Sequence, residues 1–80
     1  MKANEALKQI MDAEKLRRVD IAEKAGMQPN ELSRYLNGRR DLMGERLMHL
    51  VRALPLKAQV EFWMMMREAE EPRDELQAAS

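Results

Sequence analysis

The apolar positions of this chain recur every three or four residues, which is the spacing of one face of an α-helix. The first such repeat covers residues 4–14, where Leu7, Ile10 and Met11 are separated by polar positions. Asn4 stands at its start and can cap a helix, because its side-chain oxygen can accept a hydrogen bond from an early backbone N–H. The pattern therefore predicts a first helix over residues 4–14.

Two short helices follow, separated by residues that favour a sharp turn. The run at 17–25 stops at Gly26, and glycine readily adopts the left-handed conformation that ends a helix. Pro29 suits the first position of the next helix, because its missing N–H has no partner there, and Asn37-Gly38 ends that helix. The apolar positions of the two helices are Ile21, Ala22, Ala25, Leu32, Tyr35 and Leu36.

Two further helices complete the pattern. Asp41 is a candidate N-cap for a fourth helix that Pro55 closes, and a fifth helix over residues 56–70 ends at Pro72. The apolar positions of the fourth helix are Met43, Leu47, Leu50, Val51 and Leu54. No strand pattern or internal repeat interrupts this series, so we expect an all-α fold of five helices.

Composition sets the size and environment of this fold. Eighty residues form one small domain, which we place at residues 1–71, with a flexible tail at residues 72–80. Phe62, Trp63 and Tyr35 are the only aromatic residues, so the core must be mostly aliphatic. The chain contains no cysteine and no apolar run long enough to cross a membrane, which favours a cytoplasmic protein that does not interact with membranes.

The net charge is zero, but the charge is unevenly distributed. Residues 1–54 carry a net charge of +3, and residues 55–80 a net charge of −3. Arg34, Arg39 and Arg40 form the densest basic cluster, with no acidic residue between them. Because nucleic-acid binding requires neutralisation of phosphates, this cluster is the candidate site for a phosphate backbone.

No combination of residues indicates catalysis or metal binding. His49 is the only histidine, so neither a metal site nor a general base for Ser33 can be assembled around it. Glu23 and Glu31 are expected to be solvated. The sequence therefore predicts a protein that is not an enzyme, with no cofactor, no metal and no small-molecule substrate.

The segment RVDIAEKAGMQPNELSRYLNG combines several of these features in one motif. Two helices that cross at a tight turn need a small residue where they touch, which Ala22 supplies, while Gly26 makes the turn. With these residues and SRYLNGRR, the chain resembles the Cro/CI-type (XRE) family of phage and bacterial helix-turn-helix regulators. The resemblance covers about residues 5–54, places the helix-turn-helix at about residues 18–37, and implies a phage-repressor-like domain.

The resemblance implies binding to double-stranded DNA, with the helix that begins at Pro29 in the major groove and the preceding helix across the backbone. Side-chain chemistry is compatible with this role, because asparagine can pair with adenine and arginine with guanine. The residues expected to read bases are Gln28, Asn30, Ser33 and Arg34. The residues expected to contact phosphates are Arg17, Arg18, Asn37, Arg39 and Arg40.

Two positions depart from the family pattern. Pro29 stands where many members have a hydrogen-bonding side chain, so that only apolar contact, for instance with a thymine methyl group, is available there. Leu36 stands where the family often has glutamate, so an ion pair to the first helix is absent and that contact should be more apolar. Because of these departures, no known operator sequence can be transferred to this chain.

The run FWMMM at residues 62–66 indicates a partner chain. At 100° per residue, five consecutive apolar side chains surround a helix, and one small domain cannot bury them all. We expect part of the run to form a homodimer interface, as in a phage- or prophage-type repressor that reads a pseudo-palindromic operator. The residues assigned to this interface are Phe62, Trp63, Met65 and Met66.

Two other functions stay open at this point. An antitoxin-type or accessory-operon autoregulator would use the same fold, with the last helix facing a different protein. A phage-encoded protein-interaction module that inhibits a host protein is the alternative from another class. The balanced charge of the chain is compatible with this second alternative.

Overall fold

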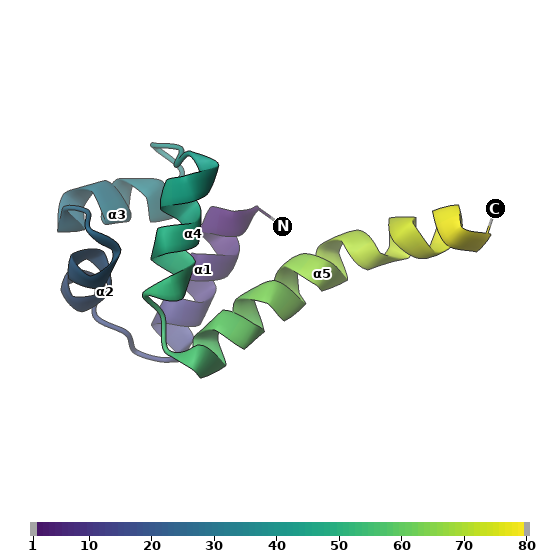
Figure 1. Ribbon diagram of the computed structural model, residues 1–80, viewed down its shortest axis with the longest axis horizontal. Helices are drawn as coiled ribbons and strands as arrows, with labels where there is room; N and C mark the ends of the chain where they lie inside the picture. Colours follow the sequence, from purple (N-terminus) through teal and green to yellow (C-terminus); the bar gives the residue numbers. More distant parts are fainter. Residues whose placement is uncertain (1, 80) are drawn as a thin grey trace.

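Five helices, with no strand among the described residues, make up the protein (Figure 1). The structure is a computed structural model that describes the backbone of residues 2–79 and the side chains of residues 2–68. The helices are α1 (Ala3–Ala13), α2 (Arg18–Ala25), α3 (Pro29–Leu36), α4 (Gly44–Arg52) and α5 (Leu56–Ala79). Helices α1 to α4 form a bundle, and α5 packs on it and then extends away from it (Figure 1). The predicted all-α fold is confirmed.

Every helix contributes to a single apolar core. Leu7 of α1, Leu32 of α3 and Leu50 of α4 are fully buried, together with Ala22 of α2 and Phe62 of α5. Helix α1 packs on α3 and α5, α2 packs on α3 and α4, and α4 packs on α5. Burial of one leucine or phenylalanine side chain stabilises the fold by about 1.5–3 kcal/mol. These contacts hold α2, α3 and α4 in place, since isolated helices of eight or nine residues are unstable in water.

Helices α1, α2 and α3 end in the same motif, in which one residue adopts a left-handed conformation. These residues are Lys15, Gly26 and Gly38, with φ of +56°, +74° and +77°. In each case the next backbone N–H bonds to a carbonyl of the last helical turn. The bonds join Leu16 to Met11, Met27 to Ala22 and Arg39 to Arg34, at 2.9, 3.0 and 2.8 Å. Glycine adopts this conformation without steric cost, whereas Lys15 adopts it despite its Cβ.

Carboxylates from the first turn complete the starts of α1 and α3. Glu5 Oε1 accepts a hydrogen bond from the Lys2 backbone N–H at 3.0 Å, and Glu31 Oε1 accepts one from the Gln28 backbone N–H at 3.2 Å. The prediction that Asn4 caps the first helix is wrong, because Asn4 already lies inside the first turn and Glu5 supplies the hydrogen bond.

The fourth helix begins later than the sequence predicts. Its first residue is Gly44, and the extended residue before it is Met43, so Asp41 is not its N-cap. Met43 is 77% exposed and takes no part in the core, whereas Leu42 packs against the core. The partly buried Leu42 thus holds the loop before α4 against the core, and Asp41 lies outside the helix.

The fifth helix is longer than the sequence predicts. The prediction that Pro72 ends it is wrong, because the backbone of α5 stays helical to Ala79. Proline removes one N–H donor, but its fixed φ of about −65° is a helical value, so a helix can continue through it with the loss of a hydrogen bond. The domain boundary at residue 71 and the flexible tail at residues 72–80 stay predictions, and Ser80 lies outside the described residues.

Lys15→Gly should raise the free energy of unfolding by about 0.5–1 kcal/mol. A side chain at a left-handed position costs roughly 1–2 kcal/mol, and the greater freedom of glycine in the unfolded chain offsets part of the gain. Equilibrium urea denaturation measures the change. Gly26→Ala is the matched counterpart and should lower stability by about 1 kcal/mol, because it places a Cβ at a left-handed φ. No atom lies within 4 Å of the added Cβ, so a steric clash adds nothing to this loss. Equal stability of wild type and Lys15→Gly would contradict this account of the α1 terminus.

Candidate nucleic-acid interface

Helices α2 and α3 meet across a tight turn formed by residues 26–28. Ala22 is completely buried, and Ile21, Met27 and Leu32 lie in the core beside it. Because protein interiors are close-packed, a larger side chain at Ala22 would push the two helices apart. The structure thus confirms the helix-turn-helix that the sequence predicts, with the small residue and the turn at the expected positions.

The side of α3 that faces away from the core is polar. Its buried side consists of Leu32, Tyr35 and Leu36. On the other side, Asn30 and Arg34 are exposed and Ser33 is half-buried, and Gln28 is exposed at the N-cap of the helix. None of the ion pairs among residues 2–68 involves Arg34. Three of the four residues expected to read bases therefore share the outer side of α3, and Gln28 stands at its start.

Arg18, the first residue of α2, reaches this surface. Its Nη1 donates a hydrogen bond to Ser33 Oγ at 3.3 Å. The preceding Arg17 lies 3.9 Å from Asp20, and both of these side chains are mostly exposed. An exposed ion pair at this distance contributes little to stability. Arg18 is therefore fixed against α3, whereas Arg17 is held only loosely.

Glu31 connects α3 to α4 and to the loop between them. Its Oε1 accepts the Gln28 backbone N–H, and its Oε2 lies 3.1 Å from Nη2 of both Arg40 and Arg46. The expectation that this carboxylate is solvated is wrong, whereas Glu23 is exposed as expected. No local pattern indicates this pairing, because Arg46 follows Glu31 by 15 residues and belongs to another helix.

The surroundings of Glu31 lower its pKa from the ordinary value. The largest cause is the hydrogen bond from the Gln28 backbone N–H; partial burial opposes it, and the hydrogen bond and charge of Arg46 and the charge of Arg40 lower the pKa further. The carboxylate is therefore charged at neutral pH and neutralises part of the basic cluster. The side chains of Arg40 and Arg46 are 37% and 40% exposed, so part of each faces solvent, although Arg40 Nε is buried without a hydrogen-bond partner.

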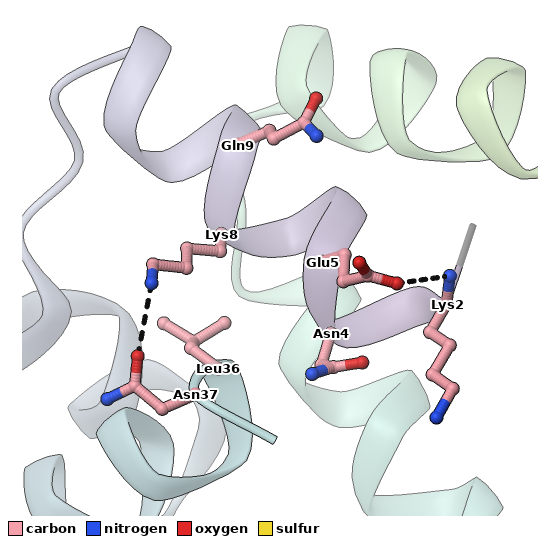
Figure 2. A pocket seen from close by; sticks show the side chains of 7 residues that line it. All are labelled: Lys2, Asn4, Glu5, Lys8, Gln9, Leu36 and Asn37. Carbon is pink, nitrogen blue, oxygen red and sulfur yellow. Dashed lines mark hydrogen bonds between the residues drawn. The ribbon is translucent and has the colours of Figure 1, made fainter.

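The C-terminal end of α3 is tied to α1. Lys8 Nζ donates a hydrogen bond to Asn37 Oδ1 at 3.2 Å (Figure 2). Beside this bond the two helices form an open groove, which is lined by Lys2, Asn4, Glu5, Lys8, Gln9, Leu36 and Asn37. Arg39 is exposed just beyond α3, and its backbone N–H bonds to the Arg34 carbonyl at 2.8 Å. Lys8 thus lies with the predicted residues at this end of α3, although no pattern in the sequence connects it with them.

The contact between α1 and α3 is apolar at its centre. Leu36 is 2% exposed and belongs to the same core as Leu7 and Met11, which confirms the apolar contact predicted for this position. Burial, and secondly the charge of Asp41, raise the pKa of the Tyr35 hydroxyl. Tyr35 is therefore neutral at physiological pH and lies on the buried side of α3.

The apolar run of α5 divides between the core and the surface. Phe62 is 1% exposed and meets Trp63 edge to face, with ring centroids 4.9 Å apart. Met65 and Met66 are half-buried against the core. Phe62 has no surface to offer a partner, because its own chain already encloses it. The exposed stripe of α5 consists of Leu56, Val60, Trp63 and Met64.

Metal binding and membrane insertion find no support in the part of the chain that the structure describes. His49 is exposed and lies 3.9 Å from Glu45. Within residues 2–68, no three histidine, cysteine or acidic side chains come close enough together to hold a metal ion. Across the described part of the chain, no helix has the length and apolar composition needed to cross a membrane.

Glu31→Gln should remove a pH-dependent part of the stability. Because the pKa of Glu31 is lowered in the folded chain, its carboxylate stabilises the fold above the unfolded pKa of about 4.3, and this contribution is lost as the pH falls through the lower folded value. Urea denaturation between pH 7 and pH 3 should therefore give a shallower loss of stability for Glu31→Gln than for wild type. Glu45→Gln, which removes an 89% exposed carboxylate, is the control. Parallel profiles for wild type and Glu31→Gln would contradict the proposed role.

The sequence of the chain matches a model of a known protein family. A family model described as helix-turn-helix, HTH_3, matches residues 7–60, from α1 into α5. No match was found among curated proteins or among solved structures. The matched segment contains the whole of α2, α3 and α4, and with them the predicted DNA-reading surface. The chain therefore belongs to the XRE/Cro-CI-type helix-turn-helix family of DNA-binding transcriptional regulators.

Proposed function

We propose that this regulator is a homodimeric repressor of the phage or prophage type, which reads a pseudo-palindromic operator with α3 in the major groove. The observation that carries the proposal is the outer face of α3, where Asn30, Ser33 and Arg34 are presented away from the core. A major groove about 12 Å wide admits one α-helix. Repression would follow from competition with RNA polymerase for the same DNA.

Arg34 is the main base-reading residue of this proposal. Its guanidinium group can donate two hydrogen bonds to guanine, and the amide of Asn30 can pair in the same way with adenine. Gln28 stands at the start of α3 and can reach a neighbouring base, while Ser33 is already oriented by its hydrogen bond from Arg18. Each good bidentate contact gives about 1–3 kcal/mol of discrimination against the wrong base.

Residues at both ends of the helix-turn-helix would hold the DNA backbone. Arg17 and Arg18 stand at the start of α2, and Asn37, Arg39 and Arg40 follow α3. Phosphate contacts of this kind fix the register of the protein on DNA without reading sequence. Arg40 shares its charge with Glu31, so Arg39 is the stronger candidate of the pair.

Arg34→Ala should weaken binding to operator DNA by about tenfold or more, while binding to random DNA changes less, because the lost contact reads a base. Fluorescence anisotropy with the promoter region of its own gene, or with a site selected from random sequences, measures both affinities at two salt concentrations. Arg52→Ala is the control, since it removes the same charge at the end of α4 and keeps the backbone carbonyl that accepts a hydrogen bond from Gln59 Nε2. Equal loss in both variants would contradict base reading by Arg34.

A second copy of the chain is the partner that we propose for the exposed stripe of α5. Val60, Trp63 and Met64 are about half exposed and Leu56 is 75% exposed, and they recur at the spacing of one helix face. One α3 covers only a few base pairs, so a two-fold dimer with α3 helices about 34 Å apart would double the length of DNA that is read. The proposed interface therefore consists of Trp63 with Leu56, Val60 and Met64, with Met65 and Met66 at its edge.

Val60→Glu should shift the chain from dimer to monomer at micromolar concentration, because it places a charge in the proposed apolar interface. Sedimentation velocity measures the change, and circular dichroism checks that the helices are retained. Val19→Glu is a closely matched control, since Val19 on α2 is 51% exposed and Val60 is 49% exposed. A wild-type chain that is already monomeric, alone and on DNA, would overturn the dimer proposal.

A further inference from the structure

The hydrogen bond between Lys8 and Asn37 determines which way the Asn37 amide faces. Its Oδ1 accepts from Lys8 Nζ at 3.2 Å, so the two N–H donors of Nδ2 are left for another acceptor. Figure 2 shows Oδ1 directed toward Lys8 and Nδ2 directed away from it. Lys8 thus presents Asn37 to its surroundings as a hydrogen-bond donor.

The charge of Lys8 is not neutralised within the described part of the chain. Arg40 and Arg46 share the carboxylate of Glu31, and Lys57 lies 3.6 Å from Glu14, whereas none of the ion pairs of residues 2–68 includes Lys8. Its ammonium group has two N–H donors besides the one directed at Asn37. Lys8 and Asn37 together therefore present a positive charge and several donors at one place.

The groove beside this pair favours an anion. Glu5 is the only acidic residue among its lining side chains, and its Oε1 is engaged by the Lys2 backbone N–H at 3.0 Å. The remaining polar lining residues are Lys2, whose ammonium group can only donate, and Asn4 and Gln9, whose amides can donate or accept. In Figure 2 Lys8 and Leu36 lie beside Asn37, with Asn4 near them, whereas Gln9 and Lys2 lie farther from Asn37.

We infer that Lys8 and Asn37 bind one phosphate of the DNA backbone, and that the groove between α1 and α3 receives the strand next to it. Asn37 follows Arg34 by three residues and Asn30 by seven, so it continues the exposed face of α3. With α3 in the major groove, the backbone at the groove edge passes the end of the helix. The inference rests on the proposed function and adds α1 to the DNA-binding surface.

Lys8→Met tests the charge, because it keeps the aliphatic stem and removes the ammonium group. Each lost phosphate contact should reduce the slope of log K against log salt concentration by about 0.9 per bound chain. We expect this change for Lys8→Met, with similar weakening on operator and random DNA. Lys57→Met is the matched control, since it removes the same charge from the start of α5, and its slope should equal that of wild type.

Asn37→Asp separates phosphate binding from a purely structural role. An aspartate can still accept the hydrogen bond from Lys8, so the link between α1 and α3 is kept, but it cannot donate and it repels phosphate. We expect affinity for both DNAs to fall by about tenfold, with the helical content unchanged by circular dichroism.

The outcomes separate this inference from the proposed function. If wild type binds DNA with selectivity and salt dependence, and both Lys8→Met and Asn37→Asp bind like Lys57→Met, the phosphate site is overturned and the proposed function stands. If wild type shows no salt-dependent DNA binding, the proposed function fails and the phosphate site fails with it.

Discussion

Helix α3 has to be rigid although only one of its sides can be packed. Eight residues are too few for a helix to persist by itself in water, and the outer side must stay uncovered if it is to enter a DNA groove. The fold meets both requirements by burying Leu32, Tyr35 and Leu36 between the other helices. Ala22 lets α2 approach closely enough for this burial. The position of every other DNA-binding candidate follows from this arrangement.

Electrostatic contacts hold the two ends of α3 in different ways. At its start, Glu31 completes the first turn and pairs with Arg40 and Arg46, so one carboxylate reduces the repulsion between two guanidinium groups and joins α3 to α4. At its end, Lys8 donates to the uncharged amide of Asn37 and keeps its full charge. The basic character of the surface is therefore concentrated toward the C-terminal end of α3, where the Arg39 backbone N–H bonds to the Arg34 carbonyl.

The apolar run of α5 at residues 62–66 contributes one side to the core and the other side to the surface. Phe62 and Ala58 complete the core beside α1 and α4, while Val60 and Trp63 remain on the outer side of the same helix. Within the described structure, α5 packs against α1 and α4 on one side, and its other side faces solvent. The exposed stripe of α5 is the surface for which we propose a second copy of the chain as the partner.

The sequence by itself determined the features that depend on neighbouring residues. Gly26 and Pro29 set the turn and the start of α3 through their own backbone preferences, and the period of the apolar positions fixed which side of α3 is polar. Local rules were insufficient at Asp41, which lies before the start of α4, and at Pro72, which α5 passes through. Only the tertiary structure decided the pairing of Glu31 with Arg46, the bond from Lys8 to Asn37, and the face of α5 that meets the core. Each of these depends on the distance between separate helices, which is set by how the whole core packs and is not encoded in any one segment.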